Sequence, residues 1–253
     1  MNENQNKLLE LLGYIPTLIV GDGHGYNPKT GEVTPGKRTP NMPDTGEPIY
    51  ENQFNKPVTD MLKVKAEAMG WDVVHVSPEL EATPLKTRTD RANEVYQDLR
   101  KKYPNVPKEK LCIGVSVHFN AYDGKFGTNK GGSSTYHCTG SKYGEILAGS
   151  IQKYLSMGTP QLNRGVKHAK FWMLRKTYMV YALVEAGFMD VLEEAKLMLN
   201  KDYQDEVATE ILQGCCEYMG IPYKYNSEID NLKTKLNKYE NIINTIKELI
   251  GGI

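Results

Sequence analysis

Apolar residues recur along the chain in two alternating patterns: short continuous runs, typical of buried strands, and helical spacings, typical of amphipathic helices. The runs predict strands at residues 17–20, 72–77, 111–118, 133–138 and 179–184. The helical spacings predict helices at residues 1–13, 51–69, 89–101, 142–155, 193–199 and 202–219. Strands that alternate with helices of this length predict an α/β fold with a mainly parallel sheet.

Two segments show neither pattern and are predicted to be loops. Residues 26–50 are rich in Gly, Pro, Asn and Thr and form the longer of the two. The run RGVK at residues 164–167 belongs to the other, between a predicted helix and the last predicted strand. A long loop beside a candidate site is more often functional than idle, so residues 26–50 are expected to contribute to function.

The first predicted strand ends in the turn GDGHG at residues 21–25. Glycines on both sides of His24 let the backbone turn sharply and let another group approach closely. His118 and Glu185 stand at the ends of two later predicted strands. Ligands of open α/β sheets bind outside the carboxyl ends of the strands. These three side chains could therefore converge, and Glu51, at the start of the first long helix, is a fourth candidate.

Two histidines and a carboxylate are a common ligand set for catalytic zinc, with a fourth position for water. A second carboxylate nearby can accept the proton of that water. Each residue also has a structural interpretation, because a lone histidine at a strand end is more often hydrogen-bonded, and Glu51 would favour a helix start. Glu185 follows an apolar run, where a carboxylate without a partner is costly. The other histidines are interpreted as structural: His75, His137 and His168.

Four motifs resemble those of zinc-dependent N-acetylmuramoyl-L-alanine amidases of the amidase-3 type, and they stand in the family's order. They are GDGHG at 21–25, YENQFN at 50–55, VSVHFNA at 115–121 and LVEAGFMD at 183–190. The runs RGVK at 164–167 and FWMLRKT at 171–177 resemble the segment before the family's catalytic strand. The resemblance extends from about Leu18 to Tyr218.

The resemblance implies a sheet of about six strands flanked by helices. It also implies a Zn²⁺ cofactor bound by His24, Glu51 and His118, with Glu185 as the general acid and base. The implied substrate is peptidoglycan. The implied reaction is hydrolysis of the amide between the lactyl group of N-acetylmuramic acid and the L-alanine of the stem peptide.

Two other functions stay open. A zinc peptidase acting on peptidoglycan stem peptides would use the same metal, although the HExxH motif common in metallopeptidases is absent from the sequence. An inactive wall-binding module would keep the fold without the chemistry. Substitution of Glu185 separates these functions, because a binder would lose nothing and a hydrolase would keep its metal and lose turnover.

The long loop, with its run GKRTPNMPD at residues 36–44, is similar to amidases of phage lysis proteins. The first residues are polar and lack the apolar core of a signal peptide. No apolar run approaches the length that crosses a membrane. We therefore expect cytoplasmic synthesis without a signal peptide and action at the bacterial cell wall after release, as in phage-induced lysis.

Charge and cysteine content narrow the range of partners. Lys+Arg and Asp+Glu both number 31, so the strong electrostatic footprint of a nucleic-acid-binding protein is not expected. The four cysteines fit neither a zinc ribbon nor a CxxC redox motif, and we expect them to be reduced. They are Cys112, Cys138, Cys215 and Cys216.

After Pro222 the composition changes to a heptad pattern. Apolar residues spaced alternately three and four apart are Ile229, Leu232, Leu236, Tyr239, Ile243, Ile246 and Ile250. Such a/d spacing over three heptads is typical of a coiled coil. We therefore predict a catalytic domain at 1–222 and a C-terminal coiled-coil-like helix at 223–253. We also predict a homo-oligomer formed through residues 228–250, the alternative being a helix docked on its own domain.

Overall fold

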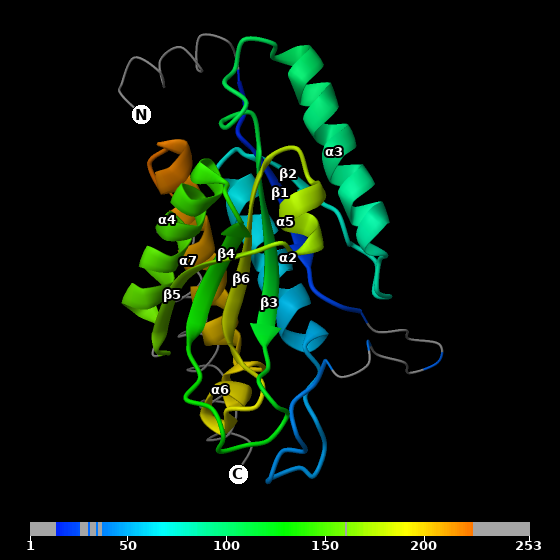
Figure 1. Cartoon of the computed structure of the whole chain (residues 1–253), viewed down its shortest axis with the longest axis vertical. Coiled ribbons are helices and arrows are strands. Elements are labelled where there is room, and N and C mark those ends of the chain that lie inside the picture. The colour runs from blue at the N-terminus through cyan, green and yellow to red at the C-terminus, as the bar shows by residue number, and fades with distance from the viewer. Residues whose placement is uncertain (1–13, 26–29, 31–33, 35–36, 160, 225–253) are drawn as a thin grey trace, which may run out of the picture. The chain divides into compact units, whose positions relative to one another are not determined.

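A central six-stranded sheet organises the computed structural model, which describes residues 14–25, 30, 34, 37–159 and 161–224 (Figure 1). The strands are β1 (Thr17–Asp22), β2 (Asp72–His75), β3 (Ile113–Asn120), β4 (Ser133–Cys138), β5 (Asn163–Ala169) and β6 (Val180–Phe188). They lie in the order β2-β1-β3-β6-β4-β5, and each neighbouring pair is parallel except β4 and β6, which are antiparallel. The predicted α/β fold with a mainly parallel, six-stranded sheet is confirmed.

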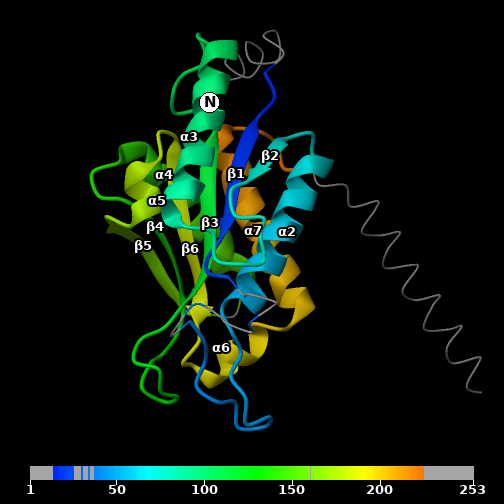
Figure 2. The ribbon, with the colours of Figure 1, turned by 90° about the vertical axis from the view of Figure 1, so that its right-hand side faces the viewer.

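Helices cover both faces of this sheet (Figure 2). They are α2 (Asn52–Ala68), α3 (Leu85–Lys102), α4 (Lys142–Gly158), α5 (Trp172–Lys176), α6 (Leu192–Leu197) and α7 (Lys201–Met219). Helices α2, α4 and α7 pack together and contribute Phe54, Ile151 and Ile211 to the larger core. Helices α3 and α5 contribute Ala92 and Met173 to a smaller core on the other face.

Strand β1 is buried on both faces because it lies inside the sheet. Leu18 and Val20 pack in the larger core, and Ile19 packs in the smaller one. All six residues of β1 are buried, which explains why the sequence shows a continuous apolar run rather than an alternation. The strand therefore fixes the position of the turn that follows it.

Residues 163–169 form strand β5, so the prediction of a loop at 164–167 is wrong. This strand lies at the end of the sheet order and pairs with β4. Most of its side chains are exposed or half-buried, and an edge strand in this setting needs no apolar run. Helix α5 is also absent from the prediction, because its five residues are too few to show a helical period.

Several element boundaries differ from the prediction, and those of β6 and α3 differ most. Strand β6 continues to Phe188, so Glu185 lies within the strand rather than at its end. Buried Ala186 and Phe188 continue the strand, and Phe188 pairs with Asn120 of β3. Helix α3 begins at Leu85, before the predicted start, because its first turn is largely polar and carries little periodicity.

By its internal contacts the chain divides into two units, Met1–Tyr223 and Lys224–Ile253. The predicted helix at 1–13 and the heptad segment at 228–250 lie outside the described residues. All four cysteines are free thiols. In the described part of the chain, no helix combines the length and apolar character that crossing a lipid bilayer requires.

Candidate metal centre and active site

His24, Glu51 and His118 converge at the carboxyl edge of the sheet. His24 follows β1, Glu51 occupies the N-cap position of α2, and His118 lies in β3. One Glu51 oxygen, Oε2, is 3.3 Å from Nε2 of His24, and the other, Oε1, is 3.1 Å from Nδ1 of His118. One candidate ligand atom from each residue lies within 4.8 Å of the other two. The structure therefore brings together the three residues that the sequence singled out as ligands.

Glu51 is held in place by donors from two other elements. Nδ2 of Asn55, one turn along α2, donates to Oε1 of Glu51 at 3.0 Å and to the Gly23 carbonyl at 2.9 Å. The backbone N–H of Phe119 donates to the same Oε1 at 3.1 Å. Burial would raise the pKa of Glu51, but His118, His24 and Asn55 outweigh burial and lower the pKa to about 2. The carboxylate is therefore anionic at neutral pH.

The glycines around His24 are required by the close packing of the chain itself. A Cβ at Gly23 would overlap the His118 ring, and a Cβ at Gly25 would overlap the backbone of Ala82. The backbone of His24 has a φ of 62°, in the left-handed region that residues other than glycine rarely adopt. This strained conformation turns its imidazole toward Glu51, and residues held in this way cluster at functional sites.

Both imidazoles have pKa values that their surroundings explain. Burial lowers the pKa of His24 to about 4, against the opposing charge of Glu51. Burial also acts to lower the pKa of His118, but the hydrogen bond and charge of Glu51 raise it overall. At neutral pH His24 is therefore uncharged, the form in which a histidine nitrogen binds a metal.

The donor set fits a zinc ion. Zinc bonds of about 2.0–2.2 Å in a tetrahedron place neighbouring donor atoms about 3.3 Å apart, and Oε2 of Glu51 lies 3.3 Å from Nε2 of His24. Two nitrogens and one carboxylate oxygen are also ligands that zinc accepts. The polar contacts from Asn55 and Phe119 reach Oε1, so Oε2 stays available on the side of His24.

Glu185 lies beside this cluster. It is directly opposite His118 in the pairing of β3 and β6. Its Oε2 atom is buried and has no hydrogen-bond partner. Burial raises the pKa of Glu185 to about 7, although the charge of His118 acts to lower it. A carboxyl group with this pKa can accept and release a proton near neutral pH.

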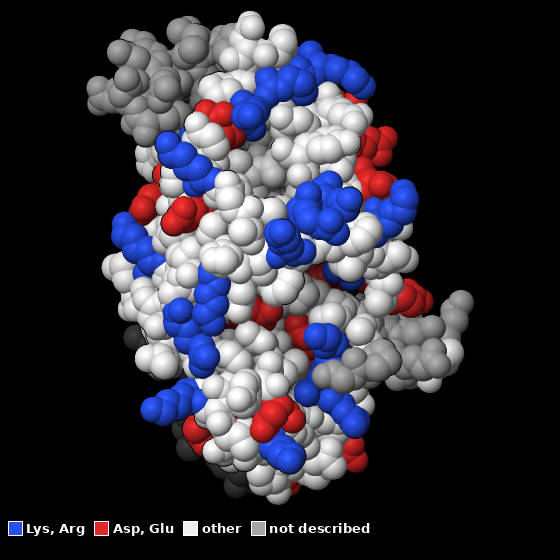
Figure 3. All heavy atoms as spheres, viewed as in Figure 1, with Lys and Arg blue, Asp and Glu red and all other residues white. Residues whose placement is uncertain are grey.

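A cavity of about 610 Å³ connects these groups. His24, His118 and Glu185 line it together with apolar side chains from the start of α3 and from α5. Lys37 and Arg88 line it as well. A volume of this size suits a ligand of several hundred daltons. On the face seen in Figure 3, Lys and Arg side chains gather over α5 and along the β4–β5 edge.

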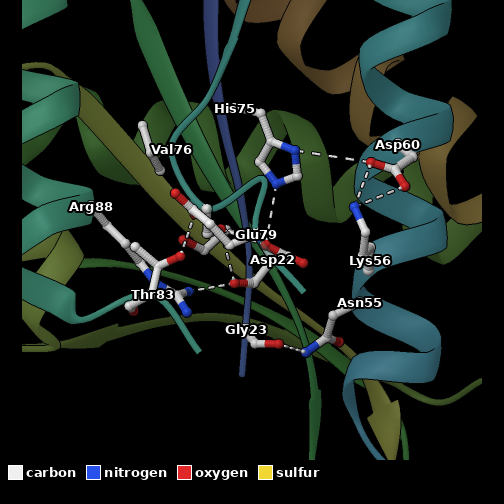
Figure 4. Close-up of polar contacts among 12 residues, drawn as sticks. Asp22, Gly23, Asn55, Lys56, Asp60, His75, Val76, Glu79, Thr83 and Arg88 are labelled. Atoms are coloured by element: carbon white, nitrogen blue, oxygen red, sulfur yellow. Dashed lines mark hydrogen bonds and ion pairs between the residues drawn. The ribbon is translucent and has the colours of Figure 1, made fainter. Parts of the chain in front are cut away.

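A buried polar cluster behind His24 fixes the end of β1 (Figure 4). The carboxylate of Asp22 accepts a hydrogen bond from the Ser77 hydroxyl and lies 3.1 Å from Nε2 of His75. On its other side, His75 lies 3.9 Å from Asp60, which pairs with Lys56. His75 is therefore a structural residue, as the sequence predicted.

The other two histidines lie away from the metal cluster. His137 on β4 contacts the carbonyl of Cys138, and His168 on β5 contacts the hydroxyl of Thr139. Sequence reasoning missed Asn55 and Arg88. Asn55 had a recognisable signal, since it follows Glu51 by four residues on the same helix, whereas nothing in the sequence distinguished Arg88 from other basic residues of its helix.

The sequence profile of N-acetylmuramoyl-L-alanine amidases of the amidase-3 type matches residues 19–217. The chain belongs to this amidase family. Among its curated amidase relatives is N-acetylmuramoyl-L-alanine amidase LytC of Bacillus subtilis (strain 168). The two are 25% identical over 197 residues, which cover 76% of this chain and 36% of LytC. The chain thus spans about a third of the length of that relative.

Solved amidase structures share the fold. An N-acetylmuramoyl-L-alanine amidase from Clostridium difficile 630 superposes with a TM-score of 0.65 at 23% identity, covering 81% of this chain and 97% of that one. The amidase AmiC2 of Nostoc punctiforme gives a TM-score of 0.63 at 23% identity, covering 81% and 97%. At this identity the likeness establishes the architecture of the amidase domain.

Proposed function

We propose that this chain is a zinc-dependent N-acetylmuramoyl-L-alanine amidase that hydrolyses peptidoglycan. It would cleave the amide between the lactyl group of N-acetylmuramic acid and the L-alanine of the stem peptide. The observation that carries the proposal is the cluster of His24, Glu51 and His118, whose two histidines line a cavity together with Glu185. Oε2 of Glu185 is buried there without a hydrogen-bond partner. Family membership supports the bond that is cleaved.

In this proposal the three clustered residues hold the metal and Glu185 moves the proton. A zinc ion held by these residues would polarise a carbonyl oxygen and lower the pKa of water from about 15.7 to roughly 7. The carboxylate of Glu185 accepts a proton from the attacking water while the carbon–oxygen bond forms. It then passes that proton to the L-alanine nitrogen as the carbon–nitrogen bond breaks. A pKa of about 7 for Glu185 suits both transfers.

Asn55 and the Phe119 N–H are positioning groups in this scheme. Both hold Oε1 of Glu51, and outer contacts of this kind fix the orientation of a metal ligand. The strained backbone at His24 follows Asp22, whose carboxylate is held in place by His75.

We place the activity in phage-induced lysis of a bacterial host, with the enzyme acting at the cell wall. Support comes from the long Gly- and Pro-rich segment at residues 26–50, which is similar to amidases of phage lysis proteins. Host range is testable by turbidity loss of cells treated from outside with the purified chain.

The deciding experiment is mass spectrometry of peptidoglycan digested by the wild-type chain and by Glu185→Gln. We expect free stem peptides that begin at L-alanine, with muramic acid intact, and loss of this product by at least about a hundredfold in the variant. Shortened stem peptides still attached to muramic acid would instead indicate a peptidase. No release from several wall types with zinc supplied would favour a binding module.

Metal analysis and a matched carboxylate variant complete this experiment. Glu185→Gln should retain the wild-type zinc content, because Glu185 is not among the three clustered ligands. Glu145→Gln, at an exposed position on α4, should leave both zinc content and product release unchanged. Loss of zinc in Glu185→Gln would contradict its assignment as a proton carrier outside the metal's ligands.

A further inference from the structure

Arg88 is a nearly buried cation whose described contacts are all to neutral groups. It is 7% exposed and lines the cavity with His24 and Glu185. Its Nε donates to the Thr83 carbonyl at 2.8 Å, and its Nη1 donates to the Asp22 carbonyl (Figure 4). Within the described ranges no carboxylate forms an ion pair with it. The charges of Asp22 and Glu79 act to raise the pKa of Arg88 against burial, but neither carboxylate contacts the guanidinium directly. A buried charge is costly without a direct partner, so Arg88 is suited to bind an anion.

The guanidinium of Arg88 keeps donors free for such an anion. It carries five N–H groups, and the two hydrogen bonds to carbonyls use Nε and Nη1. Nη2 has no hydrogen-bond partner among the described residues. It is not one of the fully buried polar atoms without a partner, so it keeps some accessible surface. Because Arg88 lines the cavity, the free edge of the guanidinium opens into it.

The acidic residues nearest to Arg88 are engaged elsewhere or lack contact with it. Glu79, on the segment before α3, binds Arg91 through two contacts of 3.0 and 2.5 Å and accepts a hydrogen bond from Thr83. Glu185 is the acidic residue among those described that line the cavity, and its buried Oε2 has no partner. The Asp22 carboxylate is bound by Ser77 and His75. A directly contacting anion is therefore expected to come from a ligand.

The start of α3 adds a second positive element to the same wall. Thr83, Pro84 and Leu85 line the cavity. The N-cap residue of this 18-residue helix is Pro84, which gives no side-chain cap, and the first turn contains no acidic residue. Neither the N-cap nor the first turn therefore supplies an acidic side chain against the partial positive charge of the helix N-terminus. The exposed cation Lys37 lines the cavity as well.

We propose that Arg88, the start of α3 and Lys37 bind the carboxylate of the stem-peptide residue that follows L-alanine. This inference rests on the proposed function and names the substrate form that the site prefers. Where that residue is D-isoglutamate, its α-carboxylate is the first anionic group beyond the cleaved amide. Where it is D-isoglutamine, the same position carries a neutral carboxamide. The planar fork of a guanidinium matches a carboxylate and not a carboxamide.

Two substrates that differ in this one group test the proposal. N-acetylmuramoyl-L-alanyl-D-isoglutamate and its D-isoglutamine counterpart would be compared by the ratio of their kcat/KM values. We expect the wild-type chain to prefer the acid on the order of tenfold or more, mainly through KM, since charge-assisted hydrogen bonds differ from neutral ones by this much. Arg88→Lys should reduce the ratio most and Lys37→Gln less. Lys108→Gln, exposed and outside the cavity lining, should keep it.

The ratio distinguishes substrate binding from a structural role of Arg88. Arg88 also ties Thr83 to the end of β1, so Arg88→Lys could slow both substrates. An equal slowing, with the ratio unchanged, would overturn the proposal, as would a wild-type ratio near one. A reduced ratio would support it even if the absolute rates also fall.

Calorimetric binding of both peptides to the wild-type chain and to Glu185→Gln separates this inference from the proposed function. Tighter binding of the acid peptide without hydrolysis by the wild-type chain would refute the amide chemistry and support the carboxylate site. Hydrolysis of both peptides at equal rates would support the amide chemistry and refute the carboxylate site. Equal or absent binding of the two peptides by either chain would also count against the carboxylate site.

Discussion

The carboxylate of Glu51 shows how single residues set up this centre. It is 2% exposed, and a buried anion without partners would be strongly unfavourable. Two N–H donors hold Oε1, and an imidazole lies close to each oxygen. The surrounding groups therefore stabilise the charge and also fix the direction in which the second oxygen points.

Removing the Asn55 amide tests this arrangement. Asn55→Ala takes away the hydrogen bonds to Oε1 of Glu51 and to the Gly23 carbonyl. We expect zinc affinity to fall by roughly 10- to 100-fold, the usual effect of losing an outer contact to a ligand. Competition with a chromogenic chelator measures this change.

The matched control is Asn93→Ala. Asn93 likewise makes two hydrogen bonds through its amide, to the Lys176 carbonyl and from the Tyr178 N–H, but it does not contact the metal cluster. The zinc affinity of Asn93→Ala should equal that of the wild-type chain. A wild-type affinity in Asn55→Ala would mean that Phe119 suffices to orient Glu51.

At this scale the sequence predicted the residues of the cluster but not what supports them. His24 and His118 were identifiable because each follows or ends a buried apolar run, and Glu51 because it opens a helix beside a long loop. Arg88 could not be found, since its significance depends on its burial beside the cavity without a direct carboxylate contact. These are properties of packing rather than of spacing along the chain.

Among the strands, those buried on both faces give the clearest signal in the sequence. β1 and β3 lie inside the sheet and carry continuous apolar runs. β5 lies at the edge, and its polar residues become a strand because β4 offers hydrogen bonds. The residues that make β5 a strand lie in β4, so the sequence of β5 by itself predicts a loop.

The contact between the end of α4 and helix α7 makes stability depend on pH. Glu210 of α7 is 5% exposed, and its Oε2 atom is buried without a hydrogen-bond partner. Burial, with the charge of Glu206, raises the pKa of Glu210 from 4.5 to about 8. Between these values the folded chain holds a proton that the unfolded chain has released. Stability should therefore fall as the pH rises through this window.

Glu210→Gln tests this dependence, because an amide cannot ionise. The drop in free energy of unfolding between pH 5 and pH 8 should be smaller in the variant than in the wild-type chain, by at least about 1 kcal/mol. Urea denaturation at both pH values measures the difference. Glu145→Gln, on the exposed side of α4, should reproduce the wild-type drop, and an unchanged drop in Glu210→Gln would refute the assignment.

For the whole molecule, we propose that residues 228–250 join copies of the chain next to a catalytic domain at 1–222. The proposal comes from the heptad spacing of apolar residues in the sequence. Leu236→Asp places a charge at an a position and should lower the mass measured by sedimentation. Thr234→Asp, at an f position of the same heptads, should leave the mass unchanged. An assembly that survives Leu236→Asp would favour the alternative, a helix docked on its own domain.

The two edges of the sheet have a consequence for how the protein behaves at high concentration. Strand β2 has four residues, and β5 presents Arg164, Lys167 and His168 along its length, where Figure 3 shows basic side chains along the β4–β5 edge. Short strands and charged side chains are the features that stop a sheet edge from templating the strands of a neighbouring chain. Both edge strands, β2 and β5, are therefore protected against fibre-like aggregation. We expect that the sheet edges do not drive association of the protein during storage or at high concentration.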